Sequence, residues 1–296
     1  MASHEKRTLE DCREQVSLYY SVITEPYRRL WGDYFHPAIY ENPEDSLETA
    51  LEKTHRRFIR DSHIQSGGSA LDLGCGIGSF SCLLAESANC QVVGVNICDF
   101  QLRKARALAK NKALENVVFE NLEIMDVARL QKKFDAAFLI DVGCHLYDKE
   151  KALAKVYEVL RERGRLVIAD WLERDHLNSF EKELLIDPMN RYWNFPYMES
   201  LGGYERFLKR IGFKIILAED VSEQTRKNWE RFYKIALDEV GTMSIKKLIS
   251  YVANPSVIRH AKKSVQLAKN QFYANVFTKV CFEAGVFRYG YLVVEK

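Results

Sequence analysis

The sequence predicts an α/β fold: a doubly wound, mostly parallel sheet of seven strands, with a helical cap from the N-terminus and a helical insert before the last strand. Three observations predict it. From residue 70 onward, short apolar segments alternate with amphipathic ones, the pattern of a parallel sheet with helices on both faces. A glycine-rich turn follows the first apolar segment. Of the 296 residues, 47% are hydrophobic and 28% charged, a globular balance that excludes a disordered chain.

Residues 1–66 are expected to form the N-terminal helical cap. Pro26 should end or bend the first helix, because proline lacks a backbone donor. The broken aromatic stretch 31–37 predicts a loop, and the periodic stretch 44–62 predicts a second helix. In residues 8–23, apolar side chains recur every three or four positions, which indicates an amphipathic helix; they are Leu9, Cys12, Val16, Tyr19, Tyr20 and Ile23.

Residues 67–221 are expected to form the core of the fold, after a break at 66–69. A helix over 149–161 should end at Gly164. The six expected strands of this segment are 70–73, 92–95, 117–119, 136–140, 165–169 and 213–218.

Residues 222–285 are predicted to be a second helical segment, and 286–296 the last core strand, with its apolar part at 289–294. A long helical insert between two late strands predicts a cap over the carboxyl edge of the sheet.

The charge and composition of the chain restrict the kinds of partner that we expect it to bind. Lys and Arg number 43 against 41 Asp and Glu, so the net charge of +2 argues against sequence-independent binding of nucleic acid. There is no apolar run long enough to span a bilayer, and residues 1–7 lack the apolar core of a secretory signal. Seven scattered cysteines without a Cys-x-x-Cys pair predict reduced, mostly buried thiols in a cytoplasmic protein, with no metal site. We expect a small-molecule substrate. Whether the protein forms a homo-oligomer is left open.

The turn Asp72-Leu73-Gly74-Cys75-Gly76-Ile77-Gly78 carries the first functional signal. Its glycines let the backbone approach a ligand where a Cβ would clash. The Gly-x-Gly-x-Gly spacing differs from the dinucleotide fingerprint, and the lysine of a phosphate-binding loop is missing. Asp72 would repel a pyrophosphate and attract a cation. These residues fit a site for S-adenosylmethionine (SAM).

Together with Val93-Gly94-Val95-Asn96-Ile97 and Gln101, this turn resembles class I SAM-dependent methyltransferases over roughly residues 66–220. The resemblance implies a Rossmann-like sheet, SAM as cofactor and S-adenosylhomocysteine as product. It places Asp72 near the methionine amino group and the glycines against the cofactor. Asn96, Ile97 and Gln101 correspond to the ribose-binding station, although Asn96 is alternatively a helix-entry residue.

Further positions are implied by the same resemblance. Glu123 and Ile124 correspond to the adenine station, and Asp141 ends the fourth strand facing the methionine. Tyr20 is expected to reach the cofactor from the N-terminal cap. Glu123 as a surface acid and Asp141 as a helix cap are the structural alternatives.

The segment Tyr19-Tyr20 to Phe35-His36 resembles the signature of sterol carbon methyltransferases and of their prenyl diphosphate and tocopherol relatives, as does Asp141-Val142-Gly143-Cys144-His145-Leu146. The resemblance implies methyl transfer to an isoprenoid alkene through a carbocation, followed by deprotonation. Aromatic faces stabilise such a cation. The residues expected to bind substrate are Tyr27, Trp31, Phe35, Arg191, Trp193, Arg226 and Trp229.

For the base, His145 is the first candidate, since an ordinary imidazole accepts a proton near neutral pH. A hydrogen-bonded core or interface histidine is the alternative. Asp141 and Glu25 are weaker candidates. Cations of the cap segments would bind a diphosphate if they converge, so prenyl diphosphate ranks before a sterol or other neutral terpenoid. These cations are Arg28-Arg29, Arg191, Arg226-Lys227 and Lys262-Lys263, and solvated helix faces are the alternative interpretation.

Two other functions stay open. An amine or oxygen methyltransferase of a natural product or small metabolite is the alternative, because residues 287–296 resemble the ends of phosphoethanolamine-type enzymes. A SAM-binding protein without turnover is the third.

Overall fold

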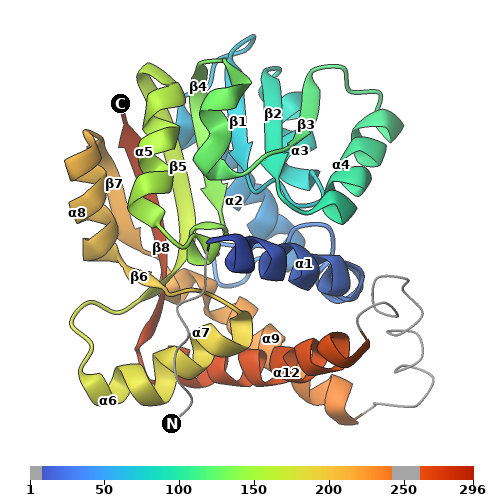
Figure 1. Ribbon diagram of the computed structural model, residues 1–296, viewed down its shortest axis with the longest axis vertical. Helices are drawn as coiled ribbons and strands as arrows, with labels where there is room; N and C mark the ends of the chain where they lie inside the picture. Colours follow the sequence, from blue (N-terminus) through green and yellow to red (C-terminus); the bar gives the residue numbers. More distant parts are fainter. Residues whose placement is uncertain (1–8, 242–260) are drawn as a thin grey trace.

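A computed structural model describes residues 9–241 and 261–296, and these form a sheet with helices on both faces and a further helical layer at one end (Figure 1). Among the described residues the sheet has eight strands, in the order β3-β2-β1-β4-β5-β8-β7, with β6 paired beside β5. All seven expected strands are present, and the two-residue β6 was not expected. Their bounds are β1 Ser69–Leu73, β2 Gln91–Asn96, β3 Val117–Asn121, β4 Phe134–Ile140, β5 Leu160–Glu173, β6 Glu199–Ser200, β7 Lys214–Asp220 and β8 Phe287–Glu295.

The two faces of the sheet carry separate apolar cores. Along β1, Ala70 contributes to one core while Leu71 and Leu73 contribute to the other, as the two-residue period of a strand requires. The first core is covered by α2 (Leu47–Ser62), α3 (Ser79–Ser87) and α4 (Asp99–Asn111). The second is covered by the 3-10 helix η1 (Ile124–Leu130), α5 (Lys149–Val159) and α8 (Leu201–Ile211).

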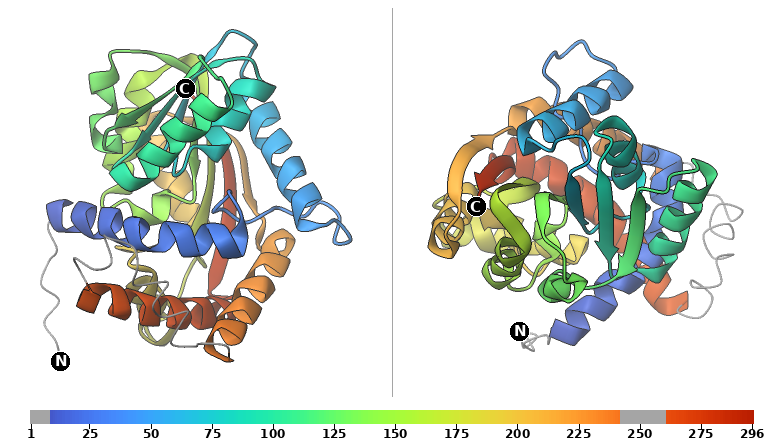
Figure 2. Two further views of the ribbon diagram at one scale, coloured as in Figure 1. Left: turned by 90° about the vertical axis from the view of Figure 1, so that its right-hand side faces the viewer. Right: turned by 90° about the horizontal axis from the view of Figure 1, so that it is seen from above.

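The helical layer lies at the carboxyl ends of the parallel strands. Figure 2 shows α1 crossing between the sheet and the pair formed by α9 and α12. The described part of the expected insert is therefore helical, while residues 242–260 lie outside the described residues. The chain between β5 and β6 also contributes to this layer. The helices concerned are α1 Leu9–Trp31, α6 Ser179–Glu181, the π-helix η3 Lys182–Ile186, α7 Asp187–Trp193, α9 Ser222–Gly241 and α12 Ala261–Glu283.

The second helix of the expected N-terminal cap, α2, packs on the sheet itself. Its Phe58 is fully buried and stacks on Tyr291 of β8, with ring centroids 5.7 Å apart. Of the described residues 9–66, only α1 and the chain that follows it reach the carboxyl ends of the parallel strands. The expected boundary at residue 66 stays a prediction.

Two expected helix ends differ from the structure. Pro26 does not end the first helix, since α1 continues through it to Trp31. One lost backbone hydrogen bond is outweighed there by the burial of Tyr19, Ile23 and Tyr27 along a single stripe. Helix α5 ends at Val159 rather than near Gly164, because Leu160 is already extended and pairs with β4.

The last strand has a direction that matters for the site. β8 runs antiparallel to both β5 and β7. Its N-terminal half therefore lies beside the carboxyl end of β5, where Trp171 is opposite Tyr289. Six cysteines of the described residues are buried, as expected. None of the described helices has the length and apolarity needed to cross a membrane.

Candidate active site

A cavity opens at the carboxyl edge of the sheet, between the glycine turn, α1 and the aromatic residues of the helical layer. The structure brings most of the expected site residues to it from segments far apart in the chain. Those that line the cavity are Tyr20, Tyr27, Phe35, Asp72, Gly74, Gly76, Asn96, Ile97, Gln101, Glu123, Ile124, Asp141, His145 and Trp193.

The glycine turn places one carboxylate and one open backbone position at the cavity. Asp72 is buried, and Ser81 Oγ donates a hydrogen bond of 2.5 Å to its Oδ2. Burial raises the pKa of Asp72 to about 6, and the Ser81 hydrogen bond lowers it. A Cβ on Gly76 would meet nothing within 4 Å, so this position leaves room for a ligand.

Gly78 has a structural role in helix packing. Its φ is +81°, and a Cβ there would come within 2.7 Å of Ala105 and Phe119. The residue therefore allows α3 to start close against α4 and β3, and it does not line the cavity.

Ser79 was missed by the sequence analysis. It begins α3, lines the cavity, and its buried hydroxyl has no hydrogen-bond partner among the described residues. A buried hydroxyl without a partner is costly, so it is available to a polar ligand. Its place directly after the glycine turn was the signal that could have found it.

Asn96 and Gln101 connect the end of β2 to α1. Asn96 Nδ2 donates to Gln101 Oε1 at 2.9 Å, and Gln101 Nε2 donates to Thr24 Oγ1 at 3.0 Å. Asn96 Oδ1 also accepts the backbone N–H of Cys98 at 3.2 Å, which is the helix-entry role left open above. Hydrogen bonds inside the protein thus fix the side chains expected at the ribose station.

Glu123 and Ile124 lie at the start of η1, on the same side of the cavity. The Glu123 side chain is 20% exposed and lies 3.9 Å from Arg13 of α1. Burial raises the pKa of Glu123, and Arg13 lowers it. Glu123 is therefore a partly buried acid under α1 rather than a fully solvated one.

Asp141 follows β4 in a left-handed conformation, with φ of 55°. Tyr289 Oη donates to its Oδ1 at 2.5 Å, and the Trp171 side chain also hydrogen-bonds it. Burial raises the pKa of Asp141 to about 8, against the lowering effect of these two donors.

His145 ends the short 3-10 turn that follows Asp141. Its Nε2 lies 2.8 Å from Tyr20 Oη, and its buried Nδ1 has no hydrogen-bond partner among the described residues. Burial, and secondarily the charge of Lys149, lower the pKa of His145 to about 3. The imidazole is therefore neutral at physiological pH.

Aromatic side chains form the remaining wall. Trp171 lies 4.9 Å from Trp193 and 5.6 Å from Phe195, between ring centroids. Phe195 in turn lies 4.9 Å from the His145 ring. Neither Trp171 nor Phe195 was among the residues expected to bind substrate, because a core strand and a loop both contain such residues for packing alone.

The Asp, Glu, Lys and Arg side chains that line the cavity within the described residues are all acidic. Four carboxylates line the cavity, and within the described residues its lining includes no Lys or Arg. The carboxylates are Asp33, Asp72, Glu123 and Asp141.

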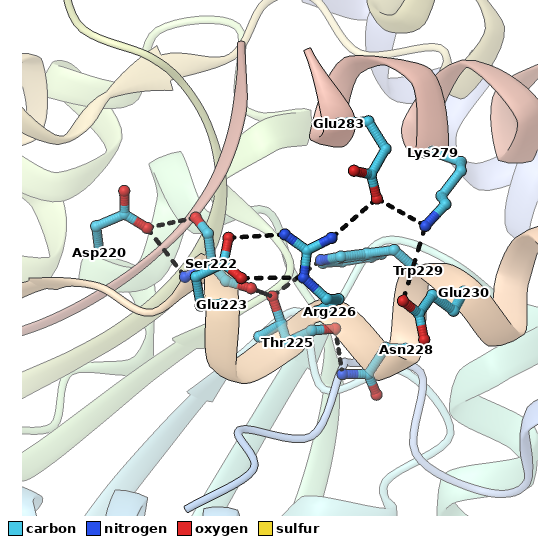
Figure 3. Close-up of polar contacts among 10 residues, drawn as sticks. All are labelled: Asp220, Ser222, Glu223, Thr225, Arg226, Asn228, Trp229, Glu230, Lys279 and Glu283. Carbon is cyan, nitrogen blue, oxygen red and sulfur yellow. Dashed lines mark hydrogen bonds and ion pairs between the residues drawn. The ribbon is translucent and has the colours of Figure 1, made fainter. Parts of the chain in front are cut away.

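The cations expected near a diphosphate lie elsewhere. Arg226 contacts Glu223 at 3.0 Å and Glu283 at 2.9 Å, so it joins α9 to α12 (Figure 3). Arg28 pairs with Asp33 at 2.6 Å, and Arg191 is exposed on α7. The side chains of Lys262 and Lys263 lie outside the described side chains.

Three further expected residues do not line the cavity. Glu25 pairs with Lys104 of α4. Trp31 packs against Phe232. Trp229 is fully buried behind the wall, 4.9 Å from Trp171.

Comparison with known proteins fits this geometry. Residues 64–235 match a family model described as a methyltransferase domain. The sterol 24-C-methyltransferase of Saccharomyces cerevisiae is 28% identical over 222 residues, which cover 74% of this chain and 58% of that protein. The chain thus spans less than two thirds of the sterol methyltransferases it matches.

Two other similarities extend the comparison. The chloroplastic tocopherol O-methyltransferase of Arabidopsis thaliana is 24% identical over 281 residues, covering 86% of this chain and 80% of that one. The geranyl diphosphate C-methyltransferase of Streptomyces coelicolor A3(2), solved with Mg²⁺, geranyl diphosphate and S-adenosyl-L-homocysteine, superposes with a TM-score of 0.68. That match covers 98% of this chain and 99% of the other at 13% identity, which establishes a shared fold.

Proposed function

Because the chain belongs to the methyltransferase domain family, we propose that it is a SAM-dependent C-methyltransferase whose acceptor is an uncharged isoprenoid alkene. One observation carries the choice of acceptor: a cavity with an aromatic wall and a lining of carboxylates without Lys or Arg among the described residues. The sterol and geranyl diphosphate relatives support an isoprenoid, and the charge of the lining selects within that class.

The residues present fit SAM. Asp72 is a buried carboxylate at the cavity, and among the described side chains only Ser81 hydrogen-bonds it. A cationic ammonium group would therefore supply the missing counter-charge and further hydrogen bonds. Gly76 leaves open space, and the Ser79 hydroxyl lacks a partner. Asn96 and Glu123 would hold the ribose and the adenine.

When bound, SAM supplies an electrophilic methyl group. The protein must orient the acceptor, because well-oriented partners gain roughly 7–11 kcal/mol as effective molarity. Trp171, Trp193 and Phe195 exclude water and present ring faces to the positive charge that develops on the acceptor. A group at the cavity then accepts a proton to restore the alkene.

The charge of the cavity reverses the order of acceptors expected from the sequence. A diphosphate needs several Arg or Lys donors, or a metal, and the described lining includes no Lys or Arg. Arg226 and Arg28 are already paired with acids. A sterol or another neutral terpenoid therefore precedes a prenyl diphosphate in this proposal.

One observation favours the second candidate, an amine methyltransferase. The carboxylate of Asp141 at the cavity would also bind an ammonium or accept its proton. An amine, however, leaves the large aromatic wall without a role.

The test is turnover with isotopically labelled SAM and matched acceptors, with products identified by mass spectrometry. The acceptors are a neutral linear or polycyclic terpenoid, geranyl diphosphate, and a small primary amine. Methylation at carbon of the neutral terpenoid, with little product from the other two, supports the proposal. Preference for the diphosphate contradicts the charge argument, and preference for the amine replaces the reaction class.

A further inference from the structure

Lys149 is a buried charged residue that the proposed reaction does not use. It is the first residue of α5, and its side chain is fully buried. Burial lowers the pKa of Lys149 to about 8, and the charge of Asp170 raises it, so the side chain is mostly an ammonium group at neutral pH. Burying an ammonium group is costly unless its donors are satisfied. The groups that satisfy them therefore indicate what this side chain holds in place.

The three donors of the ammonium group meet groups from two segments of the chain. Lys149 Nζ donates to Leu146 O at 3.0 Å and to Tyr197 O at 2.9 Å. It also lies 3.4 Å from the centroid of the Tyr197 ring, whose face attracts a cation. Lys149 thus connects the chain just after His145 to the loop between α7 and β6.

Both connected segments contribute to the lining of the cavity. Leu146 directly follows His145, and both line the cavity. Tyr197 lies two residues after Phe195, which also lines it. The rings of His145 and Phe195 meet edge to face, with centroids 4.9 Å apart. Lys149, which is not part of the lining itself, therefore joins from behind the two segments whose rings meet in the cavity.

The turn of His145 is held from its other side by the sheet. Asp170 of β5 accepts the N–H of Cys144 with Oδ1 at 3.1 Å and the Tyr204 hydroxyl with Oδ2 at 2.6 Å. Gly143 passes so close to the side chains of Asp170 and Tyr204 that a Cβ would collide with both. The turn is thus fixed to β5 independently of the lysine, so loss of the lysine contacts should release the loop from the turn.

We propose that Lys149 is a positioning residue for the acceptor, which keeps the His145 turn and the Phe195 loop together as one closed wall. This role rests on the proposed function. Without the lysine, the carbonyl groups of Leu146 and Tyr197 lose their common donor. We expect the loop then to move away from the turn and to let water reach the acceptor.

The test uses the full chain and the variant Lys149→Met, which has a side chain of similar length without any N–H donor. We expect the KM for the neutral terpenoid to rise about tenfold, because a displaced wall orients the acceptor poorly. SAM affinity, measured by calorimetry, should change less than about twofold, since the lysine contacts hold the acceptor side. Lys151→Met is the matched control, because Lys151 is exposed on the same helix, and it should change neither quantity.

Two further variants separate positioning from a general loss of structure. Lys149→Gln keeps N–H donors without the charge, so its KM should lie between those of the wild type and Lys149→Met. Phe195→Ala completes a double-mutant cycle with Lys149→Met. If the lysine acts through the Phe195 ring, adding Lys149→Met to Phe195→Ala should raise the KM less than about twofold further.

Backbone hydrogen exchange, measured by mass spectrometry without any acceptor, tests the contacts themselves. In Lys149→Met, exchange should become faster in residues 194–198, because the loop has lost its connection to the turn. Exchange in the glycine turn 74–78 should stay unchanged. Lys151→Met should exchange as the wild type does.

Two results overturn the proposal in distinguishable ways. If the wild type methylates the terpenoid and Lys149→Met does so with an unchanged KM, or loses SAM affinity to the same extent, the positioning role is wrong and the proposed function stands. If the wild type methylates no terpenoid while exchange becomes faster in residues 194–198 as expected, the proposed function is wrong, and the role of Lys149 toward that acceptor is wrong with it.

Discussion

The two halves of the cavity are built differently. On the side expected to bind the cofactor, Asn96 and Gln101 are held by hydrogen bonds inside the protein, and the Ser79 hydroxyl is left without a partner among the described residues. On the side proposed for the acceptor, Trp171, Trp193 and Phe195 come from three separate segments and form an aromatic wall. The first half fixes positions for polar contacts, whereas the second excludes water and leaves the shape of the acceptor to packing.

The largest effect is expected for a substitution of Asp72, which should affect the binding of SAM. Asp72→Ala should weaken SAM binding by a factor of about 100 or more, because it removes the buried partner of the cofactor ammonium. Calorimetry of SAM binding measures this loss. Asp33→Ala, at another carboxylate of the lining, is the control and should bind SAM nearly as the wild type does. Equal affinities in both variants would remove the assignment of the methionine end.

On the acceptor side, Trp193→Ala should raise the KM for the terpenoid about tenfold or more and leave SAM affinity intact. It deletes a buried ring of the wall, whose Nε1 donates to Thr278 Oγ1 at 2.8 Å. Trp31→Ala removes the same side chain outside the lining and should lower Tm without changing KM. Steady-state kinetics with both substrates checks the difference, and equal KM changes would contradict the placement of the wall.

A smaller effect should appear in stability at acid pH. His36 lines the cavity, and its Nε2 lies 3.0 Å from that of buried His55. Burial lowers the pKa of His36 to about 4 and also lowers that of His55. Folded pKa values below the unfolded value of 6.5 mean that stability present above pH 6.5 is lost as pH falls toward 4.

Thermal unfolding measured between pH 7 and pH 4.5 should therefore show a falling Tm, and His55→Gln should flatten that fall. His176→Gln, at an exposed histidine, is the control and should follow the wild type. A fall of Tm in His55→Gln as steep as in the wild type would assign acid sensitivity to other groups.

The smallest effect is expected at Arg226. Its ion pairs with Glu223 and Glu283 lie outside the cavity, so Arg226→Ala should change turnover and KM less than about twofold. A large loss of affinity for geranyl diphosphate in this variant would show that the cation reaches the acceptor after all. Kinetics with the diphosphate and the neutral terpenoid in parallel separates the two cases.

The sequence predicted the sheet well because the evidence for each strand is local. Apolar runs such as 136–140 mark buried strands, and the glycine turn marks the cofactor end by its own composition. The acceptor side is different. Trp193 and Trp229 have the same residue type in similar helical surroundings, yet one lines the cavity and the other packs behind it. Composition indicates burial, but the direction of a side chain depends on contacts distant in sequence.

Contacts between side chains far apart in the chain could not be predicted from the sequence either. Tyr289 and Asp141 are 148 positions apart, and their hydrogen bond depends on the antiparallel insertion of β8. Glu25 and Arg226 were expected at the site from charge alone, and the structure gives each an opposite charge elsewhere. No periodicity predicts such partners.

The place of β8 between β5 and β7 means that the sheet is incomplete until residues 287–295 have been synthesised. A nascent chain complete through residue 286 carries the whole cofactor turn, but β7 still lacks the strand it pairs with and β5 exposes an open edge. The tyrosine that holds the Asp141 carboxylate arrives with the following few residues. The turn expected to bind the cofactor is therefore synthesised more than 200 residues before the tyrosine that holds the Asp141 carboxylate.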